Sequence, residues 1–115
     1  MSIKSMKSCI DACIACALEC QNCATECLKE NDIKSLALCI SLDRECAVVC
    51  TAAAEMMAMG GENAMILCQA CAAICTTCAA ECERNNELVH CRHCAEACKR
   101  CAEECREMTE VQVSQ

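Results

Sequence analysis

The residues best suited to chemistry in this sequence are its cysteines, which number 19 in a chain of 115 residues. Within three of their four groups the intervals between them alternate between three and four residues. The groups are Cys9, Cys13, Cys16, Cys20, Cys23 and Cys27; Cys39, Cys46 and Cys50; Cys68, Cys71, Cys75, Cys78 and Cys82; and Cys91, Cys94, Cys98, Cys101 and Cys105. A thiolate is both a nucleophile and a soft metal ligand. The cysteines therefore predict either metal binding or redox chemistry.

Six Cys-x-x-Cys pairs occur within these groups, starting with Cys13 and Cys16. A single such pair is compatible with redox chemistry or with metal binding. Six pairs in one register, with no thioredoxin-like strand pattern beside them, favour metal. On a helix the residues i and i+3 lie on one face, so both thiolates reach a single ion.

The alternating intervals also predict the elements that position the thiols. They are the a/d pattern of a helix that turns one stripe toward partner helices, and the intervening Ala, Glu, Lys and Gln favour helix. Asn31-Asp32, Gly60-Gly61 and Asn85-Asn86 divide the pattern. The predicted helices cover residues 3–29, 33–59, 62–84 and 87–110. Because the connections are short, we expect an all-α, antiparallel up-down-up-down four-helix bundle with a Cys-lined core, formed by 1–115 as a single domain.

The composition excludes several classes of protein. The net charge of −7 disfavours nucleic acid and anionic membranes as partners, and no apolar run approaches the ~20 residues that span a bilayer. An odd number of cysteines, the absence of Pro and the presence of only two Gly disfavour a disulfide scaffold. The N-terminal segment lacks the cleavage site of a signal peptide, so we expect a cytoplasmic protein with reduced thiols. No catalytic constellation is visible, and we expect no enzyme.

The thiol pattern favours Cu(I) among the soft metals. Zn(II) takes four tetrahedral ligands, and several four-thiolate sites in one core would accumulate negative charge. Cu(I) accepts two or three thiolates, so about one ion per bridging thiolate gives a neutral core. Storage of multiple Cu(I) ions per chain is the leading interpretation. Storage of zinc or another soft metal, or an iron–sulfur or redox protein, remains the alternative.

Four further residues are possible auxiliary metal ligands: Asp43, Met57, His90 and His93. Asp43 continues the cysteine stripe of its helix, unless a small rotation turns Leu42 inward instead. Met57 belongs to a group of methionines at one bundle end, which is either a Cu(I) port or an apolar plug. His90 and His93 lie at the opposite, polar end. They are either entry ligands or surface residues at a helix start.

In the number and helical register of its cysteines, from Cys9 to Cys105, the chain resembles the Cys-rich four-helix-bundle copper storage proteins, specifically their cytosolic branch. The resemblance implies a preformed bundle, Cu(I) loaded into its core for storage or buffering, and a homotetramer. Apolar residues on the outer faces of the first two helices, such as Ile14, Leu18 and Val48, independently predict a homo-oligomer. Acidic surface residues could attract a cationic copper chaperone.

Overall fold

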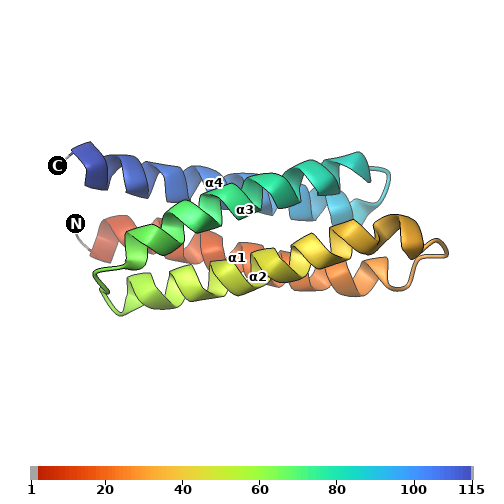
Figure 1. The fold of residues 1–115 in the computed structure, drawn as a ribbon, viewed down its shortest axis with the longest axis horizontal. Coiled ribbons are helices and arrows are strands. Elements are labelled where there is room, and N and C mark those ends of the chain that lie inside the picture. Colours follow the sequence, from red (N-terminus) through yellow and green to blue (C-terminus); the bar gives the residue numbers. More distant parts are fainter. Residues whose placement is uncertain (1–2, 115) are drawn as a thin grey trace.

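The computed structural model describes the backbone of residues 3–114 and the side chains of residues 6–110. The helices are α1 (Ile3–Cys27), α2 (Ala37–Ala58), α3 (Ala64–Arg84) and α4 (Val89–Ser114), and a short 3-10 helix, η1 (Lys34–Leu36), precedes α2. They run antiparallel to their chain neighbours in a bundle of 49 × 21 × 18 Å, with both termini at one end (Figure 1). The predicted four-helix bundle is confirmed.

The helix ends follow from local hydrogen bonds. After α2, Gly60 takes a positive φ of 68°, which only glycine adopts without strain. The Gly60 amide then donates to the Met57 carbonyl and the Gly61 amide to the Met56 carbonyl, both at 3.0 Å. This is a Schellman motif, which satisfies carbonyls at the end of the helix.

Several helix boundaries differ from the predicted ones. Residues 34–36, predicted as part of the second helix, form η1, because the Ser35 hydroxyl donates to the Asp32 carbonyl at 2.9 Å and the Leu36 amide to that of Ile33 at 2.9 Å. The fourth helix does not end near residue 110: the backbone stays helical to Ser114, since no Pro or Gly interrupts it.

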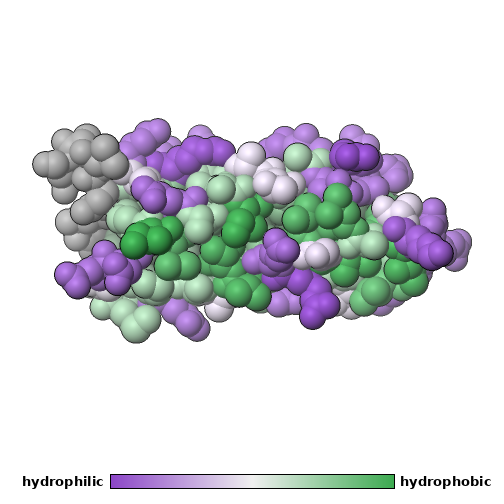
Figure 2. All heavy atoms as spheres, viewed as in Figure 1, coloured by the Kyte–Doolittle hydropathy of each residue, from purple (hydrophilic) through white to green (hydrophobic). Residues whose placement is uncertain are grey.

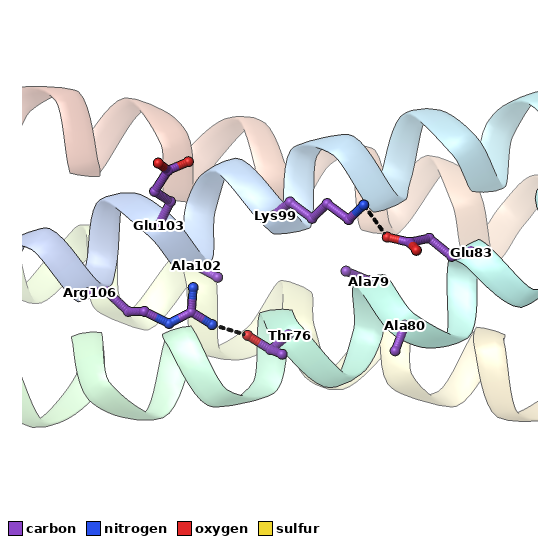
Figure 3. Close-up of a pocket in the computed structure, with 8 residues that line it drawn as sticks. All are labelled: Thr76, Ala79, Ala80, Glu83, Lys99, Ala102, Glu103 and Arg106. Carbon is purple, nitrogen blue, oxygen red and sulfur yellow. Dashed lines mark hydrogen bonds and ion pairs between the residues drawn. The ribbon is translucent and has the colours of Figure 1, made fainter.

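Alanine sets the spacing between paired helices. Contacts are more extensive between α1 and α2, and between α3 and α4, than across the other two seams. Ala17 and Ala54 line the α1–α2 seam, and Ala79 and Ala102 line the α3–α4 seam (Figure 3). Side chains this small let two backbones approach closely, so the bundle consists of two tight helical hairpins.

Polar contacts close the α3–α4 seam on its outer side. The Arg106 guanidinium donates to the Thr76 hydroxyl at 2.6 Å, and Lys99 forms an ion pair with Glu83 (Figure 3). Among the described helices, α3 alone is long and apolar enough to span a membrane. Buried cysteines and alanines, among them Cys68, Ala72 and Cys75, contribute to this apolar character.

Candidate metal centre

The 19 thiols form one column along the bundle axis. Every cysteine is buried, with an exposed fraction of at most 1%, and all are free of disulfide bonds. Each helix contributes because its cysteines recur every three or four residues and so fall on one face. The column begins near Cys9 and Cys105, whose Sγ atoms lie 3.6 Å apart, and reaches Cys27 and Cys91, which are 3.9 Å apart at the other end.

Thiols from different helices meet in groups suited to a metal ion. In each group the four sulfur atoms lie within 4.8 Å of one another. The groups include Cys13, Cys71, Cys101 and Cys105; Cys16, Cys46, Cys50 and Cys75; Cys16, Cys20, Cys46 and Cys98; Cys20, Cys78, Cys94 and Cys98; and Cys23, Cys27, Cys39 and Cys91.

Neighbouring groups share sulfur atoms. Cys16 and Cys46 belong to two groups, and so do Cys20 and Cys98. The Cys46 Sγ lies 3.8 Å from that of Cys16 and 3.5 Å from that of Cys75. A shared sulfur can bridge two ions, so the arrangement suits a continuous cluster better than a set of separate four-ligand sites. Shared thiolates also lower the negative charge per ion.

Asp43 places a fully buried carboxyl group among the thiols. Its side chain is fully buried, and its Oδ1 accepts from the thiols of Cys78 and Cys94 at 3.3 Å and from that of Cys82 at 3.7 Å. Asp43 therefore faces the column, whereas Leu42 is only partly buried at its flank. The alternative rotation, with Leu42 inward, is wrong.

Burial shifts the acidity of the groups in the column. Desolvation disfavours the charged form and raises the pKa of Asp43 to about 8, with a further contribution from the nearby Cys94 thiolate. Desolvation likewise raises the pKa of Cys27 to about 11 and the pKa of Cys91 above its ordinary value. The thiols of Cys27 and Cys91 therefore carry protons at neutral pH, and a thiophilic metal ion must displace them.

The two candidate histidines lie at the Cys27 end of the bundle but differ in their contacts. His90 is partly buried, and its Nε2 atom lies 3.4 Å from the Cys27 Sγ. His93 is exposed on α4. The structure thus brings His90, but not His93, into contact with the last thiol of α1.

The opposite end of the column is covered by methionine. Met57 is 1% exposed and Met108 is 6% exposed, and both pack into the same apolar cluster as the cysteines. Met6, Met56 and Met65 are partly buried against that cluster. The Met57 side chain therefore belongs to a closed apolar layer that covers this end of the thiol column. This burial fits the plug better than the port.

The heptad pattern identified which residues enter the core. It could not predict which of them contact one another across different helices. That Cys46 meets Cys75, or that Asp43 meets Cys94, depends on the relative height of α2, α3 and α4. The one signal available for Asp43 was its place in the stripe between Cys39 and Cys46.

Comparisons with known proteins agree with this geometry. The family model described as copper storage protein matches residues 2–110. A Bacillus subtilis relative, the uncharacterised cysteine-rich protein YhjQ, is 43% identical over 80 residues, which cover 70% of this chain and 74% of the relative.

Two solved structures have the same fold. The Cu(I)-bound copper storage protein BsCsp3 has a TM-score of 0.87 and 42% identity, over 91% of this chain and 98% of that one. A cytosolic copper storage protein from Streptomyces lividans, described with five coppers, has a TM-score of 0.90 and 38% identity, over 94% of both chains.

Proposed function

Because the chain belongs to the copper storage protein family, we propose that it stores multiple Cu(I) ions on the thiolates of its bundle core. The observation that carries the proposal is the continuous column of 19 buried thiols, in which neighbouring four-sulfur groups share members. A protein that used one reactive cysteine would need an exposed thiolate, and every thiol here is buried.

Charge supports a monovalent ion. Each Cu(I) that replaces one thiol proton leaves the core neutral, so many ions fit without buried counterions. Four-coordinate Zn(II) sites would each retain two negative charges in a column that has no basic side chain among its buried residues. All 19 cysteines are the proposed ligands.

Asp43 and His90 are proposed auxiliary ligands, for different reasons. The Asp43 carboxylate offers an oxygen ligand within 3.3 Å of two thiols, between Cys39 and Cys46 on the inner face of α2. His90 stands beside Cys27 at the polar end, where it could receive an ion and pass it to that thiol. His93 and Met57 lack a comparable contact to a thiol and remain weaker candidates.

Replacing His90 with alanine is expected to slow Cu(I) loading several-fold while leaving the final capacity almost unchanged. The reason is that His90 lies at the end of the column and supplies one ligand beside many thiols. Stopped-flow mixing of the reduced protein with a coloured Cu(I)–chelator complex measures both quantities. His93→Ala is the matched control, since His93 is exposed, and it should load like the wild type. Equal loading rates for the two variants would contradict an entry role for His90.

Competition between metals tests the alternative that the thiols store zinc. Thiolate ligands prefer Cu(I) to Zn(II), and the low coordination number of Cu(I) suits shared sulfurs. Adding Cu(I) to zinc-loaded protein under anaerobic conditions should release nearly all the zinc, which a zinc-sensitive dye reports. Excess Zn(II) should release almost no copper. Displacement in the opposite direction would identify zinc as the cargo.

We further propose that the protein works in the cytosol, as the Streptomyces lividans neighbour does by its description, and that it assembles as a homotetramer. Reduced thiols, which the column requires, are maintained in that compartment. A cationic copper chaperone is a plausible donor because the net charge is −7. We assign the chain no catalytic role.

A further inference from the structure

The two ends of the thiol column differ in how they meet solvent. At one end a layer of buried methionines covers Cys9 and Cys105. The other end carries the α1–α2 and α3–α4 connections, and hydrophilic residues lie at its tip (Figure 2, right). There the partly exposed His90 reaches the buried Cys27, with 3.4 Å between Nε2 and Sγ. An ion arriving from solvent at this end therefore meets an imidazole that contacts the column.

The ligand atoms at the His90 end differ from those inside the column. Inside, an ion meets sulfur atoms and the single carboxyl group of Asp43. At the His90 end it meets an imidazole nitrogen beside a sulfur, with a carboxylate close by. The pKa of that carboxyl group, on Glu26, is lowered by a hydrogen bond from the Lys29 ammonium, 2.6 Å away, and further by nearby His90. Nitrogen and oxygen ligands suit Cu(II), whereas thiolates suit Cu(I).

Two thiols that can supply electrons lie behind His90. The Cys27 Sγ on α1 is 3.9 Å from the Cys91 Sγ on α4. A disulfide bond requires about 2.05 Å between the sulfurs, so side-chain movements of about 2 Å in total bring this pair together. Formation of a disulfide releases two electrons, and reduction of one Cu(II) consumes one. The pair therefore holds the electrons for two ions.

We propose that the His90 end reduces Cu(II) and passes the resulting Cu(I) to the column. Two Cu(II) ions bind in turn between His90 and Cys27, and each accepts one electron. The Cys27 and Cys91 thiols lose two electrons and two protons, and an S–S bond forms between their sulfur atoms. In total, two Cu(II) and two thiols give two Cu(I), one disulfide and two protons released to solvent.

This step goes beyond the proposed storage of Cu(I), but it rests on that function because the remaining thiols bind the Cu(I) formed. Their preference for Cu(I) drives the reduction forward. The electrons come from the protein's own thiols, so the reaction is stoichiometric. A low-molecular-weight thiol of the reducing cytosol restores the pair by thiol–disulfide exchange: two small thiols become one disulfide, and Cys27 and Cys91 regain their protons.

The covered end of the column provides an internal comparison. Cys9 and Cys105 also join α1 to α4, and their sulfurs are closer together, at 3.6 Å. Both histidines of the chain, however, belong to the opposite end, and the methionine layer separates this pair from solvent. If access through His90 controls the reaction, the more widely spaced pair is the one that oxidises.

Anaerobic mixing of the reduced protein with two equivalents of Cu(II) tests the reaction. The electron paramagnetic resonance signal of Cu(II) should disappear, with the loss of one free thiol per ion. Peptide mass mapping after alkylation in denaturant should find the cross-link between Cys27 and Cys91, and none between Cys9 and Cys105. A persistent Cu(II) signal, or cross-links spread along the whole column, would overturn the proposal.

Two pairs of variants locate the step. Cys91→Ser should slow Cu(II) reduction about tenfold, because it removes the thiol that completes the disulfide, whereas Cys105→Ser should leave the rate nearly unchanged. His90→Ala should also slow the reduction about tenfold, and the exposed His93→Ala should not. Equal reduction rates within either pair would refute the assignment.

Titration of the same variants with Cu(I) alone separates this inference from the proposed function. Cys91→Ser and Cys105→Ser each remove one thiol of 19, so each should lose about one ion of capacity. Full Cu(I) capacity without reduction of Cu(II) would refute the reduction step alone. A wild-type protein that binds only one or two Cu(I) would instead refute storage.

Discussion

The reduced protein is expected to bind roughly one Cu(I) per cysteine, on the order of 15–20 ions per chain, in an anaerobic titration against a chromophoric Cu(I) chelator. The expectation rests on 19 buried thiols whose four-sulfur groups share members, so each sulfur can serve two ions. The chelator should stay uncoloured until the column is filled. Saturation after one or two ions would be incompatible with a storage role.

Single substitutions should show that the middle of the column matters more than its end. The Cys46 sulfur lies within 4.0 Å of four others, those of Cys16, Cys50, Cys75 and Cys98. The Cys9 sulfur lies at the end of the column, 3.6 Å from that of Cys105. We therefore expect Cys46→Ser to remove two or more ions from the capacity, whereas its matched control Cys9→Ser removes about one. Equal losses at the two positions would argue against bridging thiolates.

The second large effect concerns Asp43 in the metal-free protein. Replacement by asparagine should raise stability at pH 7 by about 4 kcal/mol and the melting temperature by more than about 10 °C. The cause is the buried carboxyl group, whose pKa rises from 3.8 to about 8 because burial penalises its charge. Asparagine keeps an oxygen that can accept from the Cys78 and Cys94 thiols, but it cannot ionise.

The direction of the pH dependence follows from the same shift. The folded protein binds the Asp43 proton more tightly than the unfolded chain, so this contribution to stability is fully present below pH 3.8 and is lost as the pH rises toward 8. Thermal melts of the reduced apo protein between pH 4 and 8 should therefore show wild-type stability falling relative to that of Asp43→Asn. Asp11→Asn is the control, since Asp11 is exposed, and its melts should follow the wild type. Parallel curves for all three proteins would contradict an ionising carboxyl group in the core.

The Cu(I) capacity of the Asp43→Asn variant also tests whether Asp43 binds copper. If the carboxylate is an auxiliary ligand, Asp43→Asn should change the capacity by no more than about one ion, since the thiols supply nearly all the ligands. Stability and capacity would then respond separately to one substitution. Stability would depend on the charge of the Asp43 carboxyl group, whereas copper capacity would depend on its oxygen atom as a ligand.

The helix boundaries illustrate where sequence reasoning stops. Gly60 and Gly61 marked the end of the second helix correctly, because a helix C-terminus needs a residue that adopts a positive φ. Residues 34–36 had no such marker. Their 3-10 conformation depends on hydrogen bonds such as the one from the Ser35 hydroxyl to the Asp32 carbonyl, for which the local sequence offered no distinctive pattern.

The sequence by itself determined which residues enter the core, because alternating intervals of three and four place Cys9 through Cys105 on one face of each helix whatever the helices pack against. It also determined the antiparallel topology, because the connections between consecutive helices are too short for those helices to run parallel. Only the tertiary structure decided which thiols meet, that Asp43 touches Cys78, Cys82 and Cys94, and that His90 but not His93 reaches Cys27. These contacts depend on the relative height and rotation of neighbouring helices, which are set by how alanines such as Ala17 and Ala54 pack in the seams. Periodicity along one chain segment carries no information about that alignment.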